Sequence, residues 1–461
     1  MNSRYPSHVP APMDPNSNRH GGIDGLFANE RNPDPLPPPP PHRNNKDWRK
    51  RKHEDHFAPD AKRRRADNST HPMSQQSLHA RHFSNTDREV AGSSRSSSSV
   101  LNHLHPSTNY SSNSDDPANP CSSMFISPYA NDKLSSQMFN LFKMCTQQPS
   151  DLNCKEMCRT WLQQDVRVFE MGRLYMTGST MSGFASRSSD ADLCYVLHES
   201  FQKKKDPVAV LYALQRILKS KDYLDKLHLI RAKVPILRFR RKGSNQIFDL
   251  NVNNTVGIRN TFLLKSYAFV EPRVRPLVLV IKKWARHHKI NDASQGTLSS
   301  YALALMVLHY LQTREKPVLP SLQLDFPECF DPTLDIDMIP ERAKCIPRYC
   351  SDNNSSLGML LLGFLRYYAT EFSWEKSVIS VRTGRALPKE DNQEWRGKFI
   401  CVEEPFERKN VARAVYKRDK FDAIKTQFFK SWRTLQWRMD LNAFLPVQEI
   451  IDDETSLYKL F

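Results

Sequence analysis

The chain has 461 residues, enough for two or three domains, and 39% of them are hydrophobic. Lysine and arginine exceed the acidic residues by 17 charges, which favours an anionic partner such as nucleic acid. No run approaches the ~20 apolar residues of a membrane span, and the first residues lack the apolar core of a signal peptide. Nine cysteines form no Cys-x-x-Cys pair, so we expect reduced thiols in an intracellular protein that has no membrane partner.

Residues 1–125 hold almost no periodic apolar pattern and are predicted to be a disordered, low-complexity tail. The proline run at 36–45 is either a docking site for an aromatic groove or an inert spacer. The basic clusters at 48–57 and 61–68 suit either a bipartite nuclear-import signal or loose contact with nucleic acid. The expected location is therefore the cytoplasm, with the nucleus as a second site.

The first ordered half, up to residue 268, is predicted to be a small mixed sheet backed by helices. Its periodicity and turn residues indicate strands of four to eight residues between amphipathic segments. Pro207 and Asp206 mark the start of one helix, as a first-turn proline and its cap. The expected elements are a helix at 133–150, a helix-to-strand passage at 161–178, a strand entered at 190–197, a helix at 206–223, and strands at 234–239 and 246–252.

From Pro272 onward the pattern turns helical, which makes the fold class α+β. Helices are expected at 275–289, 298–312, 358–372 and 421–438. We therefore divide the chain into a tail (1–125), a helix that packs with the second domain (126–160), a catalytic domain (161–268), a mainly helical central domain (269–446) and a C-terminal tail without an interpretable pattern (447–461).

Two carboxylates, Asp190 and Asp192, enter an apolar run within Met176–Leu197. Side chains two apart on a strand point to the same face, so these like charges repel unless a cation lies between them. Mg²⁺ is the natural candidate, with Mn²⁺ as an alternative, because hard oxygen ligands suit it. Gly178 and Ser179 stand upstream, where a glycine turn can bring backbone N–H groups close to a phosphate.

An Asp-x-Asp pair alone is weak evidence for nucleotidyl transfer, because it is also a common polar start of a strand and occurs in sugar-nucleotide transferases. A third carboxylate, Asp249, lies at the centre of the β-like run QIFDLNV (246–252). On a neighbouring strand it would complete a cluster able to hold two metal ions. This combination favours nucleotidyl transfer over sugar transfer.

The ordered motifs resemble the nucleotidyltransferase superfamily of DNA polymerase β. The segments at 253–267, 278–303, 356–372 and 401–413 narrow the resemblance to cytoplasmic poly(A) polymerases of the germline-development type, which are template-independent terminal nucleotidyltransferases. The resemblance covers roughly residues 130–446. It implies a polymerase-β-like nucleotidyltransferase domain followed by a helical central, PAP-associated domain.

The resemblance also implies roles for Gly178, Ser179 and the three carboxylates. Asp190 and Asp192 would ligate both metals, and Asp249 would hold the metal on the primer side and accept the hydroxyl proton. Gly178 and Ser179 would cradle the β- and γ-phosphates of the nucleotide. Alignment and charge stabilisation would then carry the reaction without a covalent intermediate.

By the same resemblance, Asn260 and Thr261 match positions that contact the ribose hydroxyls. Lys282 and Arg286 match cations that neutralise the triphosphate, although the family often has lysine at the second position. The simpler interpretation of these two is a solvated helix face.

Three further residues would complete the nucleotide site. Ser300 matches a phosphate contact, and Tyr301 matches an aromatic platform for the base, although a tyrosine in so apolar a helix could belong to the core. Glu404 lies in the base-reading loop 401–413. Uridylyl-adding relatives carry a histidine shortly before the loop asparagine; here no histidine stands between Glu407 and Asn410.

The expected substrates are ATP and the 3′ end of an RNA, either a messenger RNA or a microRNA. The sequence shows no RNA-recognition motif, zinc knuckle or Gly-x-x-Gly loop, so the resemblance implies RNA-binding adaptor proteins that choose the targets. Two alternatives stay open: a terminal uridylyltransferase, and an inactive fold that serves as a scaffold for RNA or a partner. Inactive members usually lose carboxylates, and all three stand here.

Overall fold

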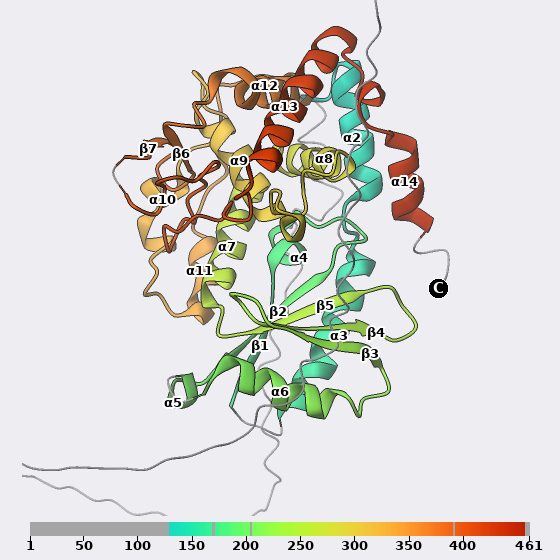
Figure 1. The fold of residues 1–461 in the computed structure, drawn as a ribbon. Coiled ribbons are helices and arrows are strands. Elements are labelled where there is room, and N and C mark those ends of the chain that lie inside the picture. The colour runs from blue at the N-terminus through green and yellow to red at the C-terminus, as the bar shows by residue number, and fades with distance from the viewer. Residues whose placement is uncertain (1–128, 168–170, 203–204, 391, 457–461) are drawn as a thin grey trace, which may run out of the picture. The chain divides into compact units, whose positions relative to one another are not determined.

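The computed structural model describes residues 129–167, 171–202, 205–390 and 392–456 (Figure 1). The expectations for the tail, its proline run and its basic clusters lie outside the described residues. The two-lobed core that the sequence predicts lies within them.

The first lobe is built on a mixed five-stranded sheet with the order β1-β2-β5-β4-β3. Strand β2 runs parallel to β5, and the other neighbours are antiparallel. The strands are β1 (Gly172–Thr177), β2 (Ala191–Leu197), β3 (Leu224–Ile230), β4 (Ile236–Arg241) and β5 (Ile247–Val252). Sequence patterns missed β3, because a register shift between Asp225 and His228 interrupts its alternation.

One face of this sheet is covered by two helices, α3 (Pro149–Val166) and α6 (Pro207–Leu218). The Asp206 carboxylate caps α6 by accepting from the Val208 and Ala209 N–H groups, which confirms the predicted start. Helix α3 corrects the domain boundary: residues 149–160 were expected to pack with the central domain, but Cys158, with Leu162 and Val166 of the same helix, joins the sheet core.

The second lobe is mainly helical and has its own continuous apolar core. The predicted helices are present as α8 (Val274–His287), α9 (Ser300–Gln312), α12 (Leu357–Arg366) with a π-helical continuation (Tyr367–Glu371), and α13 (Arg418–Arg438). As expected, α2 (Lys133–Cys145) packs into this core despite preceding the sheet. Helix α7 (Thr255–Val270) contributes to both lobes.

The remaining elements are short, with one exception. They are α4 (Gly178–Ser182), α5 (Glu199–Gln202), α10 (Leu322–Asp325), α11 (Ile339–Ala343), the β6–β7 hairpin (Ser377–Ser380, Arg385–Pro388) and single 3₁₀ turns at Ala293–Gln295, Pro327–Cys329, Ile336–Met338 and Leu441–Ala443. The exception is α14 (Val447–Ser456), which forms where the sequence indicated only a tail.

Within the described part of the chain, no helix has the length and apolar character that crossing a membrane requires.

Candidate active site

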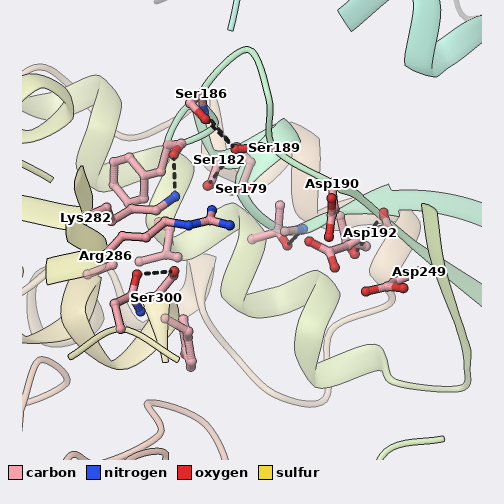
Figure 2. A pocket seen from close by; sticks show the side chains of 18 of the residues that line it. Ser179, Ser182, Ser186, Ser189, Asp190, Asp192, Asp249, Lys282, Arg286 and Ser300 are labelled. Atoms are coloured by element: carbon pink, nitrogen blue, oxygen red, sulfur yellow. Dashed lines mark hydrogen bonds between the residues drawn. The ribbon is translucent and has the colours of Figure 1, made fainter. Parts of the chain in front are cut away.

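The three predicted carboxylates lie together on the sheet face that α3 and α6 leave open. Asp192 of β2 stands directly opposite Asp249 of β5 in the parallel register, and Asp190 immediately precedes β2. Figure 2 shows the three side chains gathered on one side of a pocket. The arrangement has two causes. Side chains two residues apart in extended backbone point to the same side, and the register of β2 with β5 places Asp192 beside Asp249.

Burial and mutual repulsion make this cluster costly to ionise. Burial, followed by the charges of Asp249 and Asp190, raises the pKa of Asp192 to about 7. Burial and Asp249 also raise the pKa of Asp190. A cation placed among these oxygens would remove the repulsion, which is the electrostatic signature of a metal-binding carboxylate cluster.

Arg238 on β4 supplies part of that positive charge, and sequence patterns did not single it out. It stands opposite Asp249, and its guanidinium donates to both carboxylate oxygens over 2.7 and 2.6 Å. The same group lies 3.9 Å from an Asp190 oxygen. The only sequence signal is an arginine at a polar-face position of the alternating run 234–239.

The donor set nevertheless fits Mg²⁺, because three carboxylates on adjacent strand positions are the hard oxygen ligands that this ion prefers. As they stand, no three acidic, histidine or cysteine side chains among the described residues converge on one point. Arg238 donates one hydrogen bond to each oxygen of Asp249, and each of these oxygens keeps a second lone pair that can face a metal ion.

Gly178 forms the turn beneath the carboxylates. Its φ is +68°, and a Cβ at this position would lie 2.0 Å from the Asp192 Oδ2 atom. The Gly178 N–H donates to the Thr261 hydroxyl over 2.9 Å, and that hydroxyl donates to the Gly257 carbonyl. Thr261 therefore also anchors the Gly178 turn to α7, a role that the sequence did not suggest; its contact with a ribose hydroxyl stays a prediction.

Asn260, Glu404 and Tyr301 form the opposite end of the site. The Asn260 Nδ2 atom donates to Glu404 Oε1 over 2.6 Å, while Glu404 Oε2 accepts from the N–H groups of Phe406 and Glu407. The Asn260 Oδ1 atom and the Tyr301 hydroxyl are buried without a hydrogen-bond partner. Unpaired buried polar atoms are costly, so both mark places where a ligand could bind.

A cationic wall completes the pocket on α8, where Lys282 and Arg286 lie one turn apart. Figure 2 shows these two and Ser300 across the pocket from the carboxylates. Lys282 Nζ donates to the Phe184 carbonyl over 2.9 Å, and the Ser300 hydroxyl donates to Asn291 over 3.1 Å. Burial, with help from the neighbouring Lys283, lowers the pKa of Lys282 to about 8.

A cleft of about 1300 Å³ connects these groups, and it lies between the two lobes. All twelve residues predicted from the sequence line it. The cleft also includes residues that were not predicted, among them Lys283, Arg413 and four acidic or apolar positions of α14.

Lys282 predicts a pH dependence for anion binding in this pocket. The lysine is charged below its pKa of about 8 and neutral above it, so binding of a polyphosphate anion should weaken as the pH rises from 7 to 9. We expect the dissociation constant of inorganic tripolyphosphate to rise across this range in the native chain and to stay nearly flat in Lys282→Arg, because arginine keeps its charge. A flat native profile would show that Lys282 does not bind the anion.

Comparison with known proteins places this geometry in a family. Residues 134–269 match the model for the central palm domain of poly(A) RNA polymerases of the mitochondrial-like type, and residues 356–410 match the Cid1 family poly A polymerase model. Poly(A) RNA polymerase GLD2 of Homo sapiens is 54% identical over 332 residues, covering 70% of this chain and 69% of the relative. The chain belongs to the GLD2 family of poly(A) RNA polymerases.

A second GLD2 relative and two solved structures, a GLD-2 and a poly(U) polymerase, are also similar to this chain. The Danio rerio GLD2 is 60% identical over 317 residues, and the match spans 68% of this chain and 65% of that relative's length. The GLD-2 chain of the GLD-2/RNP-8 complex superposes with a TM-score of 0.59 at 34% identity, covering 69% of this chain and 97% of the other. The Cid1 poly(U) polymerase bound to MgGTP gives 0.57 at 27% identity, covering 69% and 98%.

Proposed function

We propose that this chain adds AMP from ATP to RNA 3′ ends without a template, by two-metal nucleotidyl transfer. One observation carries the proposal: Asp192 and Asp249 stand side by side in register, with Asp190 beside them and the glycine turn beneath. Membership of the GLD2 family and a cleft lined by every predicted nucleotide contact support it. Messenger RNA in the cytoplasm is the expected substrate, with microRNA and the nucleus as further possibilities to test.

The carboxylates would hold the metals and position the attacking group. When bound, Mg²⁺ would lower the pKa of the RNA 3′-hydroxyl and neutralise charge on the leaving pyrophosphate. Asp190 and Asp192 would face both ions, and Asp249 would lie on the primer side and accept the hydroxyl proton. Lys282 and Arg286 would bind the triphosphate from the opposite wall, and the turn at Gly178, with the Ser179 N–H and hydroxyl, would hold its outer phosphates.

The nucleoside would occupy the end of the cleft formed by Tyr301, Asn260 and Glu404. The unpaired Asn260 Oδ1 atom can accept from a ribose hydroxyl, which would favour ribonucleotides. Glu404 Oε2 already accepts two hydrogen bonds, but Oε1 accepts only one and retains a lone pair, so it can also accept from the exocyclic amine of adenine. Tyr301 would stack on the base, and a purine offers it more surface than a pyrimidine.

Target choice would come from adaptor proteins. Solved GLD-2 chains are described as complexes with RNP-8 and with GLD-3, which supports a partner-directed enzyme. The lining of the cleft includes the cations Lys282, Lys283 and Arg286, which can contact RNA phosphates, and charge contacts alone are blind to sequence.

The proposed activity is tested by incubating the full chain with a labelled oligoribonucleotide, Mg²⁺ and each of the four nucleoside triphosphates separately. ATP should extend the oligonucleotide in the absence of a template, and the other three should extend it poorly. Extension with UTP alone would favour the uridylyltransferase alternative. A folded chain that extends with no nucleotide would favour the scaffold.

Base choice should respond to the length of the loop 401–413. This loop closes tightly, because the Glu404 N–H donates to the Lys409 carbonyl and the buried Asn410 side chain fixes its end. Inserting a histidine between Lys409 and Asn410 should weaken the ATP preference and increase UTP use by about tenfold, a change within the range of a single added contact. Extension rates with ATP and UTP at equal concentration measure it.

An alanine inserted at the same place is the matched control. It changes the loop length without adding an imidazole, so it should reduce ATP use without a matching gain for UTP. A native chain that prefers UTP, or a histidine insertion that leaves the ratio unchanged, would contradict the role assigned to this loop.

A further inference from the structure

Helix α14 forms one wall of the cleft, although nothing in the sequence marked it as functional. Val447 and Ile451 bury it in the core of the helical lobe, and it packs against α2 (Figure 1). On its other side, Glu449, Ile450 and Glu454 line the cleft. The helix is thus fixed to one lobe and faces the loop 183–190 between α4 and β2 of the other, which we call the active loop.

Glu454 makes the contact between α14 and that loop, and only 3% of it is exposed. Its Oε2 atom accepts from the Ser188 N–H over 2.9 Å, and its Oε1 atom accepts from the Ser188 hydroxyl over 2.6 Å. The same carboxylate forms an ion pair with Lys283 of α8. Burial alone would raise the pKa of Glu454, but Lys283 and Ser188 outweigh it and hold the pKa below its usual value.

Ser188 lies two residues before Asp190, so its position affects the first metal carboxylate. The same loop is also held by the Arg187 N–H, which donates to the Cys145 carbonyl over 2.9 Å, and by the ion pair of Arg187 with Asp151 of α3 at 3.5 Å. The loop is therefore bound by contacts from α2, α3 and α14. Glu454 accepts both of the described hydrogen bonds that Ser188 donates to α14.

The ion pair also separates the roles of two adjacent lysines. Lys283 is mostly buried and paired with Glu454, whereas Lys282, its neighbour on α8, would bind the triphosphate. Without Glu454, Lys283 would be a buried cation without its partner, next to the phosphate site. Such an unpaired charge would act electrostatically on the triphosphate and on the active loop.

We propose that Glu454 is a positioning residue for nucleotidyl transfer: it holds the Ser188 segment so that Asp190 faces the metal site, and it couples α14 to the active loop. This inference rests on the proposed function, because it concerns the metal carboxylates of that reaction. It gives the C-terminal helix a role in setting metal affinity in addition to packing.

The test compares the full native chain with Glu454→Gln, which keeps the side-chain shape but loses the charge, and with Ser188→Ala, which removes one hydrogen bond at an exposed position. Two readouts do not need activity: hydrogen–deuterium exchange of residues 186–190, and Mn²⁺ affinity without nucleotide, followed by electron paramagnetic resonance. Glu454→Gln should speed exchange in this loop and weaken Mn²⁺ binding by about tenfold, as loss of an outer contact at a metal site does. Ser188→Ala should show the same changes at smaller size.

Asp452→Asn on the exposed side of α14 is the matched control and should alter neither readout. The melting temperature of Glu454→Gln should shift by less than about 4 °C, so that the metal effect is not general unfolding. Unchanged exchange, or unchanged Mn²⁺ affinity in a Glu454→Gln chain that has lost activity, would overturn the inference. A different result would separate the two proposals. If the native chain binds Mn²⁺ and transfers no nucleotide, while Glu454→Gln still speeds exchange and weakens Mn²⁺ binding, the proposed function is refuted and the coupling of α14 to the active loop is supported.

Discussion

Asp249→Ala should reduce nucleotide transfer by at least about a thousandfold while the chain stays folded, because losing a metal ligand removes several kcal/mol of transition-state stabilisation. Asp249 stands beside Asp192 in the parallel register, so no other acidic side chain of β5 can take its place on this face. The measurement is the initial rate of oligoribonucleotide extension with ATP and Mg²⁺, together with a thermal melt. Asp190→Ala and Asp192→Ala should behave alike.

The sheet provides a matched control at Asp225. This carboxylate makes the same two-point contact with Arg240 that Asp249 makes with Arg238, but Asp225 and Arg240 do not line the cleft. Asp225→Ala therefore breaks an arginine–aspartate pair of the same kind and should leave extension within about twofold of native, as surface ion pairs contribute little. Full activity in a folded Asp249→Ala chain would refute the three-carboxylate site.

Gly178→Ala is the second substitution for which we expect a large effect. Its Cβ would lie 2.0 Å from Asp192 Oδ2, so either the turn or the metal carboxylate must move. A displacement of about 1 Å at reacting groups can cost a hundredfold in rate, and we expect at least that loss in kcat/KM for ATP. Steady-state kinetics at saturating RNA measure it.

Gly243→Ala separates the clash from backbone strain. Gly243 also has a positive φ, +76°, but no atom lies within 4 Å of the position that a Cβ would take there. Both variants carry the cost of a left-handed alanine, about 1–2 kcal/mol, and only Gly178→Ala disturbs the carboxylates. Equal activity of the two variants would show that the turn does not set the position of Asp192.

Much of the candidate site could be predicted because it depends on local rules. The spacing of Asp190 and Asp192 places them on one strand face, and the apolar run around Asp249 indicates the neighbouring strand. The helices followed from periodicity and caps, as at Asp206. Resemblance to a known family then supplied the nucleotide contacts, and the cleft brings these residues together.

The contacts that sequence reasoning missed depend on pairing between distant parts of the chain. Arg238 reaches Asp249 only through the register of β4 with β5, which no local pattern determines. Glu454 meets Ser188 across 266 residues of chain, and Thr261 meets Gly178 across 83. Each is a single polar residue in a segment that resembles an ordinary surface or helix, so its role appears only when distant segments of the chain pack against one another.

The central claim is tested most directly by competition among nucleotides. The full chain is incubated with an oligoribonucleotide, Mg²⁺ and all four nucleoside triphosphates at equal concentration, and the added 3′ nucleotides are sequenced. The account predicts tails made almost entirely of adenosine in the native chain and no added nucleotides with Asp249→Ala. Tails made mainly of uridine, or adenosine tails that persist in Asp249→Ala, would contradict it.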